Sequence, residues 1–260
     1  MKIFKTTILL SLFLALITTA TIAQTLRIDT TEITYENKLR PCFAAKIDPD
    51  TKATKKEWAS YLKKNYKLKT SGLGLFTNDD LLTNEDITIA SISDKRMNLY
   101  ARITETPNGT FMKVFASFGY DFFINEKEYP KEFAALHTLM NNFLMEYLNE
   151  YYSDEVKSLN KELRSLNKEK VSLMKSTEKN KRKLESASND IAVIGVQKYT
   201  DTAEDIKQTQ KLNKLSENKI KMQNENRQAE LSIQTIEEKV SIVEKKIANF
   251  QEKHKGLIMN

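Results

Sequence analysis

The sequence predicts an α+β protein: an antiparallel sheet with covering helices, followed by a long antiparallel coiled-coil helical hairpin. Three observations support this fold class. The stretch from Lys131 to Asn260 has no proline and has glycine only at Gly195 and Gly256, so long helices can form there. Apolar residues in that stretch recur at alternating steps of three and four, which is typical of a coiled coil. The region before it alternates apolar and polar residues, as strands do.

The N-terminus has the pattern of a secretory signal. Lys2 and Lys5 precede a short apolar run, and small residues follow up to Ala23. The run is short for a membrane-spanning helix, so we expect cleavage after residues 1–23 rather than an uncleaved anchor. The mature chain would then begin near Gln24, have no transmembrane segment, and be periplasmic or secreted.

Residues 24–152 are predicted to form the α+β head. Thr54 followed by Glu57 has the spacing of a capping box, which predicts a helix over 55–65. Trp58 on that helix is expected to anchor the core. Alternating or apolar runs predict five strands, over residues 25–35, 41–47, 86–92, 97–104 and 110–118.

Two short features of the head carry specific expectations. Asn108-Gly109 lies between the last two predicted strands and favours a tight hairpin turn with positive φ at both residues. Cys42 is the only cysteine, so no intramolecular disulfide can form. It lies in a strand-like run, and we interpret it as a buried thiol; a reactive or intermolecular thiol is the alternative.

The head and the C-terminal region are predicted to share one helix. Pro130 suits a first helical position. The apolar face that follows is broad, as expected for a helix that lies on a sheet: Phe133, Leu136, Met140, Phe143, Tyr147 and Leu148. The face then narrows to a seam, so one helix is expected over 131–194, with the head ending at 152.

Residues 153–260 are predicted to form the hairpin, with its tip near 195–205, where a second helix is capped by Asp201 or Thr202. Antiparallel pairing in the best register sets Leu173 against Ile233 and Asn180 against Asn226. A buried asparagine pair would fix that register. A parallel homodimer is the alternative, because each asparagine would then meet its own copy. The two seams are Val156, Leu159, Leu163, Leu166, Leu173, Leu184, Ala187, Ile191 and Ile194, and Leu212, Leu215, Met222, Ala229, Ile233, Ile236, Val240, Val243, Ile247 and Phe250.

Composition and motifs argue against several functions. The chain has 41 Lys and Arg against 35 Asp and Glu, and the charges are interspersed rather than gathered in a basic stripe. We therefore expect no nucleic acid partner. His137 and His254 are far apart, and no nucleophile or metal-ligand motif is present. The sequence predicts no catalytic, cofactor-binding or metal-binding residues, and hence no enzyme and no cofactor.

Two segments carry a resemblance to known proteins. They are Trp58-Ala59-Ser60-Tyr61-Leu62 and Phe115-Ala116-Ser117-Phe118-Gly119, followed by a charged coiled-coil tail. This arrangement resembles a group of uncharacterised exported bacterial proteins whose heads are similar to the TATA-binding-protein-like α+β fold. The resemblance implies that fold for the head. It implies neither DNA binding nor any activity, and no site residues are carried over.

The resulting functional hypothesis is a non-enzymatic cell-envelope or secreted protein. It has a recognition head on a rigid coiled-coil stalk, which acts as a spacer, assembly or interaction module. We expect a protein partner, and the coiled coil also allows a homo-oligomer. The alternative is a periplasmic holdase-like chaperone with helical arms. It needs exposed apolar residues off the seams, for which Val171, Met174, Val193, Leu231 and Ile242 are available. A hydrolase is a third class, but no site supports it.

Overall fold

The computed structural model describes residues 26–73, 80–196 and 202–258. The predicted signal segment lies outside these residues, and so do residues 197–201 of the predicted hairpin tip, which include Asp201. Contacts divide the chain into two units, Met1–Ser153 with Gln251–Asn260, and Asp154–Phe250. We call the first unit the head and the second the hairpin. Contacts thus place the last ten residues with the head, whereas the heptad pattern extended the hairpin to the C-terminus.

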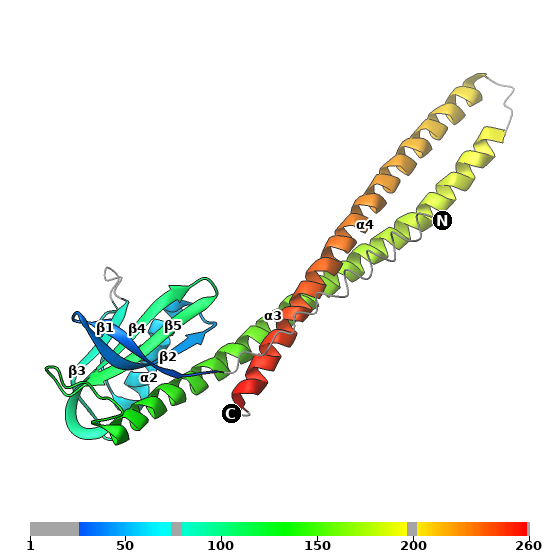
Figure 1. Cartoon of the computed structure of the whole chain (residues 1–260). Helices are drawn as coiled ribbons and strands as arrows, with labels where there is room; N and C mark the ends of the chain where they lie inside the picture. Colours follow the sequence, from blue (N-terminus) through cyan, green and yellow to red (C-terminus); the bar gives the residue numbers. More distant parts are fainter. Residues whose placement is uncertain (1–25, 74–79, 197–201, 259–260) are drawn as a thin grey trace, which may run out of the picture. The chain divides into compact units, whose positions relative to one another are not determined.

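The head is built on one five-stranded antiparallel sheet (Figure 1). This confirms the predicted fold class for the head. The spatial order is β1-β2-β5-β4-β3, so the middle of the sheet pairs strands that are distant in sequence. The strands are β1 (Asp29–Tyr35), β2 (Lys38–Ile47), β3 (Leu81–Ile89), β4 (Ser93–Thr106) and β5 (Gly109–Ser117).

The β4–β5 turn differs from the prediction. Thr106 pairs with Gly109, so the two turn residues are Pro107 and Asn108 rather than Asn108 and Gly109. Proline holds φ near −65°, which is incompatible with a turn that needs positive φ at both central residues. The expected positive φ at Gly109 is confirmed, at 119°. Asn108, in contrast, is not among the described residues with positive φ.

The first helix of the described chain, α2 (Thr51–Tyr66), begins earlier than predicted. Its N-cap is Asp50, whose carboxylate accepts a hydrogen bond from the backbone N–H of Ala53 at 2.8 Å. The expected cap, Thr54, lies inside the helix and donates its hydroxyl to the Asp50 carbonyl at 2.8 Å. Asp50 caps well because a carboxylate also interacts favourably with the positive end of the helix.

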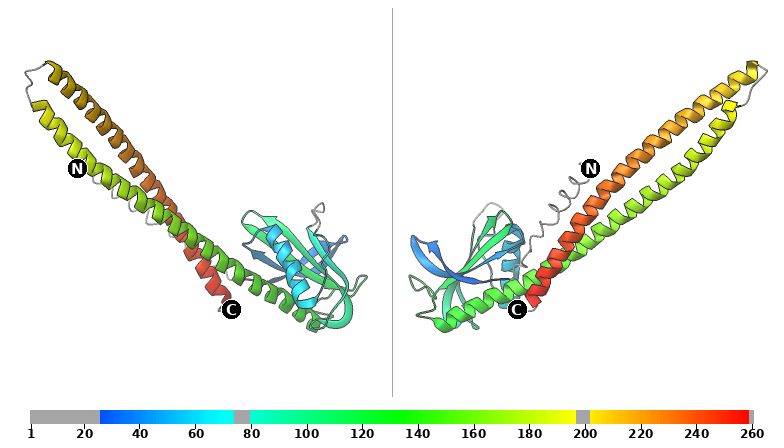
Figure 2. Two further views of the ribbon diagram at one scale, coloured as in Figure 1. Left: turned by 180° about the vertical axis from the view of Figure 1, so that it is seen from behind. Right: turned by 45° about the vertical axis from the view of Figure 1, so that its right-hand side comes forward.

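Two helices cover the same face of the sheet (Figure 2). They are α2 and the first part of α3 (Pro130–Val196). The rings of Trp58 and Phe143 meet edge to face at 4.9 Å, which joins α2 to α3. The rings of Phe43 and Phe133 lie 4.3 Å apart and join β2 to α3. The prediction that Trp58 anchors the core is confirmed, since this side chain is fully buried.

The hairpin consists of α3 from Asp154 onward and of α4 (Thr202–Ile258) up to Phe250, and these segments run alongside each other in opposite directions (Figure 1). Leu159, Val243 and Ile247 form a buried cluster between them, and flanking seam residues pack around it. Farther along, the Lys170 ammonium lies 2.7 Å from the Glu237 carboxylate. The helical hairpin is therefore confirmed, and its seam is covered by a helix of the same chain.

Candidate functional site

The head has a second apolar cluster on the face of the sheet away from α2 and α3. We call it the aromatic face: Ile33, Tyr35, Cys42, Tyr100, Phe115 and Phe123. Strand alternation places Tyr35, Tyr100 and Phe115 on the same side of the sheet. The Tyr100 and Phe115 rings are stacked at 4.8 Å, and the Tyr35 ring lies 5.0 Å from Tyr100. This cluster buries large side chains, and none of the helices in the described part of the chain lies above them.

A loop after β5 closes over part of the aromatic face. Gly119 and Tyr120 both have positive φ, 94° and 48°. These values turn the chain back, so that the backbone N–H of Phe118 donates to the Phe122 carbonyl at 2.9 Å. Phe123 then packs on the aromatic face, and Ile124 donates its N–H to Ala116 at 2.9 Å. A left-handed tyrosine is uncommon and marks a tightly constrained loop.

Asp121 of this loop is held by two cations from β2. It accepts hydrogen bonds from Lys38 and, at 2.6 Å, from Arg40. These bonds, the Lys38 bond first, lower the pKa of the Asp121 carboxyl below its ordinary value. The Arg40 guanidinium also lies 4.1 Å from the Phe123 ring centre. The pairing fixes the loop against β2 and keeps Asp121 ionised at neutral pH.

The loop and the aromatic face enclose an open hollow of about 450 Å³. Two aromatic residues on its rim are exposed to solvent: Tyr120 is 96% exposed and Phe122 is 59% exposed. Burial, followed by a hydrogen bond with Tyr100, raises the pKa of Tyr35 to about 12, so its hydroxyl stays protonated. The hollow is lined by Tyr35, Glu36, Asn98, Tyr100, Ser117, Tyr120, Asp121, Phe122 and Phe123. Such a surface suits an aromatic or aliphatic side chain with a polar or basic neighbour.

A polar cluster at the other side of the head has a structural role. The Lys253 ammonium contacts both carboxylate oxygens of Asp48 at 2.8 Å, and the Tyr152 hydroxyl donates to the same carboxylate at 2.7 Å. Burial and this bond raise the pKa of Tyr152 above its ordinary value. The adjacent cavity, about 20 Å³, is too small for a ligand. The cluster attaches the last turns of α4 to the end of β2, with Leu257 buried beside it.

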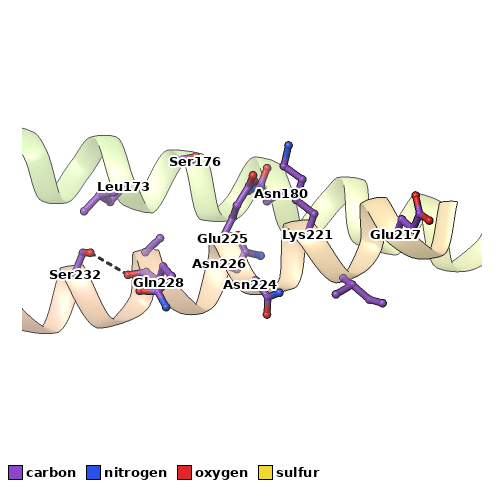
Figure 3. Close-up of a pocket in the computed structure, with 12 residues that line it drawn as sticks. Leu173, Ser176, Asn180, Glu217, Lys221, Asn224, Glu225, Asn226, Gln228 and Ser232 are labelled. Atoms are coloured by element: carbon purple, nitrogen blue, oxygen red, sulfur yellow. Dashed lines mark hydrogen bonds between the residues drawn. The ribbon is translucent and has the colours of Figure 1, made fainter. Parts of the chain in front are cut away.

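The hairpin carries a groove of about 880 Å³ between α3 and α4, lined by both polar and apolar residues (Figure 3). The predicted asparagine pair is not formed here, which corrects that expectation. Asn180 instead donates to the Glu225 carboxylate at 3.4 Å. Asn226 is buried, and within the described residues its amide oxygen has no hydrogen-bond partner. A charged carboxylate such as that of Glu225 is a stronger acceptor for the Asn180 amide than a neutral amide oxygen.

The remaining chemically active side chains are dispersed. The His137 ring packs edge-on against Phe43 at 5.1 Å, and His254 contacts the Asn149 amide oxygen at 2.6 Å. Across the described residues, no group of histidine, cysteine and acidic side chains is arranged to hold a metal ion. Over the same residues, none of the helices is long and apolar enough to cross a membrane.

The hollow involves residues that sequence reasoning did not select. Tyr35, Tyr100, Tyr120 and Phe123 come from distant segments, and only strand alternation hints that some of them share a face. Comparison with known proteins finds no matching family model, curated protein or solved structure.

Proposed function

We propose that the protein is a non-enzymatic envelope or secreted protein whose head recognises a partner protein through the hollow of the aromatic face. The hairpin then serves as a coiled-coil stalk, a spacer or assembly element. The observation that carries the proposal is the rim: Tyr120 and Phe122 are exposed on a loop that is held in place by Asp121, Lys38 and Arg40. Constrained, exposed aromatic side chains are typical anchors of protein interfaces.

The residues around the hollow favour binding over chemistry. Asp121 is engaged by two cations, and the Tyr35 hydroxyl stays protonated because burial raises its pKa to about 12. Neither group is therefore poised as a base near neutral pH.

The proposal that the protein is exported rests on the signal-like segment 1–23, and mass spectrometry of the mature N-terminus tests it. A mature chain beginning near Gln24 supports export, and an intact Met1 contradicts it.

Photocrosslinking in intact cells tests recognition by the head. We place benzoylphenylalanine at Glu36, which lines the hollow, and at Leu73, an exposed apolar residue outside it. The proposal predicts a discrete product from position 36 and none from position 73. Adding Tyr120→Ser and Phe122→Ser should abolish the product while leaving the melting temperature of the protein unchanged. Identical products from both positions, or a product that survives the two substitutions, would contradict the proposal.

The holdase alternative has one supporting observation in the hairpin. The five apolar residues that it requires are all exposed, from Val171 at 49% to Val193 at 60%. If the arms hold unfolded clients, the protein should suppress aggregation of an unfolded outer-membrane protein. Val171→Ser with Met174→Ser should weaken that effect, whereas Tyr120→Ser should not. No suppression at equimolar protein would eliminate this alternative.

A further inference from the structure

One side of α4 carries a sparse apolar stripe that faces solvent. Ile220, Leu231 and Ile242 are 58%, 52% and 54% exposed, although each is a large aliphatic residue in the middle of a long helix. The side of α4 that contacts α3 is different and includes the buried Ile236, Val243 and Ile247. None of the three is a seam residue, although Ile220 also lines the groove between α3 and α4, which Leu231 and Ile242 do not.

The spacing of the stripe makes it nearly straight. Ile220, Leu231 and Ile242 follow each other at intervals of eleven residues. At ~3.6 residues per turn, eleven residues are about three turns plus ~20°, so the three side chains lie almost in line along the helix. With about 100° per residue, the stripe is roughly opposite the seam that faces α3.

The stripe is also symmetric about its central residue, because Leu231 is equally distant in sequence from Ile220 and Ile242. An antiparallel copy of α4 related by a two-fold axis at Leu231 would place Leu231 against its own counterpart. It would also place Ile220 against Ile242 of the second copy. All three apolar residues are then covered at once, as a self-complementary interface requires.

The same two-fold axis brings opposite charges beside the stripe close together, although not into exact register. On one flank, the two-fold axis sets Glu217 opposite position 245 of the second copy, so Lys246 of that copy lies one residue, ~1.5 Å, farther along. On the other flank, Arg227 faces position 235 of the second copy, and Glu238 of that copy lies three residues, ~4.5 Å, farther along, within reach of the long arginine side chain. All four side chains are exposed, and within the described residues none of them makes an ion pair in its own chain. Opposite charges therefore meet on both flanks, and each pair occurs twice.

We infer that α4 mediates an antiparallel homodimer through Ile220, Leu231 and Ile242, with Arg227–Glu238 and Glu217–Lys246 pairs at its edges. The inference goes beyond the proposed function and does not depend on what the head binds. It also differs from a parallel dimer through the seam, because the seam is covered by α3. Three apolar layers make a small interface, so the dissociation constant should be on the order of micromolar.

Disulfide trapping tests the geometry in the full mature chain. On a Cys42→Ala background, Leu231→Cys should form a covalent dimer under mild oxidation. Neither Ile220→Cys nor Ile242→Cys should do so alone, because the two copies of each position are ~33 Å apart in the antiparallel pair. A mixture of the two chains should crosslink. A parallel pairing would crosslink each variant with itself, and failure of both Leu231→Cys and the mixture would overturn the inference.

Sedimentation equilibrium tests the energetics. Leu231→Glu should raise the dimer dissociation constant at least ~10-fold, because two carboxylates would meet at the axis. The matched control is Val171→Glu on α3, which is 49% exposed and should leave the constant unchanged. Arg227→Glu should weaken the dimer about 3–5-fold, and adding Glu238→Arg should restore it. A wild-type chain that stays monomeric above ~100 µM, or no rescue by the double exchange, would contradict the dimer.

Discussion

The head and the hairpin bury their apolar residues to different extents. In the head, Trp58, Leu99 and Phe115 are completely buried because sheet, helices and the loop after β5 surround them. In the hairpin, the best-buried aliphatic residues, Ile236 and Val243, keep 4% exposure, and most seam residues keep more. Two helices alone can cover only a narrow stripe, since each seam side chain has solvent on both flanks.

Both units bury polar groups, and in both some of these groups lack a hydrogen-bond partner among the described residues: Arg40 Nε, Thr106 Oγ1 and the Tyr147 hydroxyl in the head, and Asn226 Oδ1 in the hairpin. In the head, the buried Thr110 hydroxyl donates to the Pro49 carbonyl at 2.7 Å. In the hairpin, the buried Asn226 amide oxygen has no partner among the described residues. The units therefore differ in how completely they bury apolar side chains, and not in whether every buried polar group is paired.

The largest expected difference between the units is in truncation of a core residue. Phe143→Ala removes a ring that contacts Trp58 and Tyr61, and should lower the free energy of unfolding of the head by about 3–5 kcal/mol. Ile236→Ala in the hairpin should cost only about 2 kcal/mol, because its site can relax toward solvent. Urea titration followed by Trp58 fluorescence reports the head, and circular dichroism reports both units. An equal loss of unfolding free energy for the two substitutions would contradict the proposed difference between head and hairpin.

Glycine substitutions should have opposite signs in the two units. At Gly109, φ is +119° and an added Cβ would lie 2.2 Å from the Ile47 carbonyl oxygen. Gly109→Ala should therefore destabilise the head by about 2 kcal/mol or more. At Gly195, a Cβ in α3 would meet nothing within 4 Å. Gly195→Ala should stabilise the hairpin by up to about 1 kcal/mol. Thermal melting of both variants checks the signs; an unchanged Gly109→Ala would refute the turn geometry.

The helices could be predicted from the sequence because their signals are periodic and long. The broad face from Phe133 to Leu148 is buried in the head, and Leu159 of the narrow seam after it packs against α4. The predicted helix start and the predicted turn were wrong because neighbouring residues favour different local structures. Asp50 and Thr54 can both cap a helix, and Pro107 changes the turn that Asn108-Gly109 would otherwise make.

The candidate site could not be predicted in the same way, because it is made by tertiary contacts. Alternation places Tyr100 and Phe115 on one face, but nothing local shows that the loop after β5 folds back to add Phe123. The Asp48–Lys253 ion pair joins residues 205 positions apart, with no periodic signal at either end. The sequence also does not show that Glu225 takes the hydrogen bond expected between Asn180 and Asn226.

Substitution of the buried Asn226 in the hairpin should have a smaller effect on stability. Asn226→Leu removes an amide whose oxygen is buried without a partner, so it should stabilise the hairpin by about 1–2 kcal/mol. Asn180→Leu should change stability little, because its bond to Glu225 is long and exposed. The double variant should be additive within about 0.5 kcal/mol, since the two side chains are not bonded to each other. A larger coupling energy in urea denaturation would show that the two amides interact directly.

The smallest expected effect concerns pH and Cys42 in the head. Burial raises the pKa of the Cys42 thiol from 9.0 to about 11, although the nearby Lys113 ammonium acts in the opposite direction. The folded state therefore holds this proton more tightly than the unfolded chain. The contribution to stability is complete below about pH 9 and is lost as the pH rises toward about 11.

The raised pKa of Cys42 predicts how the stability of a Cys42 variant should depend on pH. Wild-type stability should fall above pH 9, and Cys42→Ala should fall less steeply between pH 9 and 11, even if it is less stable at every pH because of the smaller side chain. Tyr147, whose pKa burial raises to about 12, should produce a further decline at higher pH in both proteins. Urea midpoints measured across this range give the two slopes. Equal slopes would mean that Cys42 ionises in the folded head as readily as in the unfolded chain, and that this face of the sheet admits water.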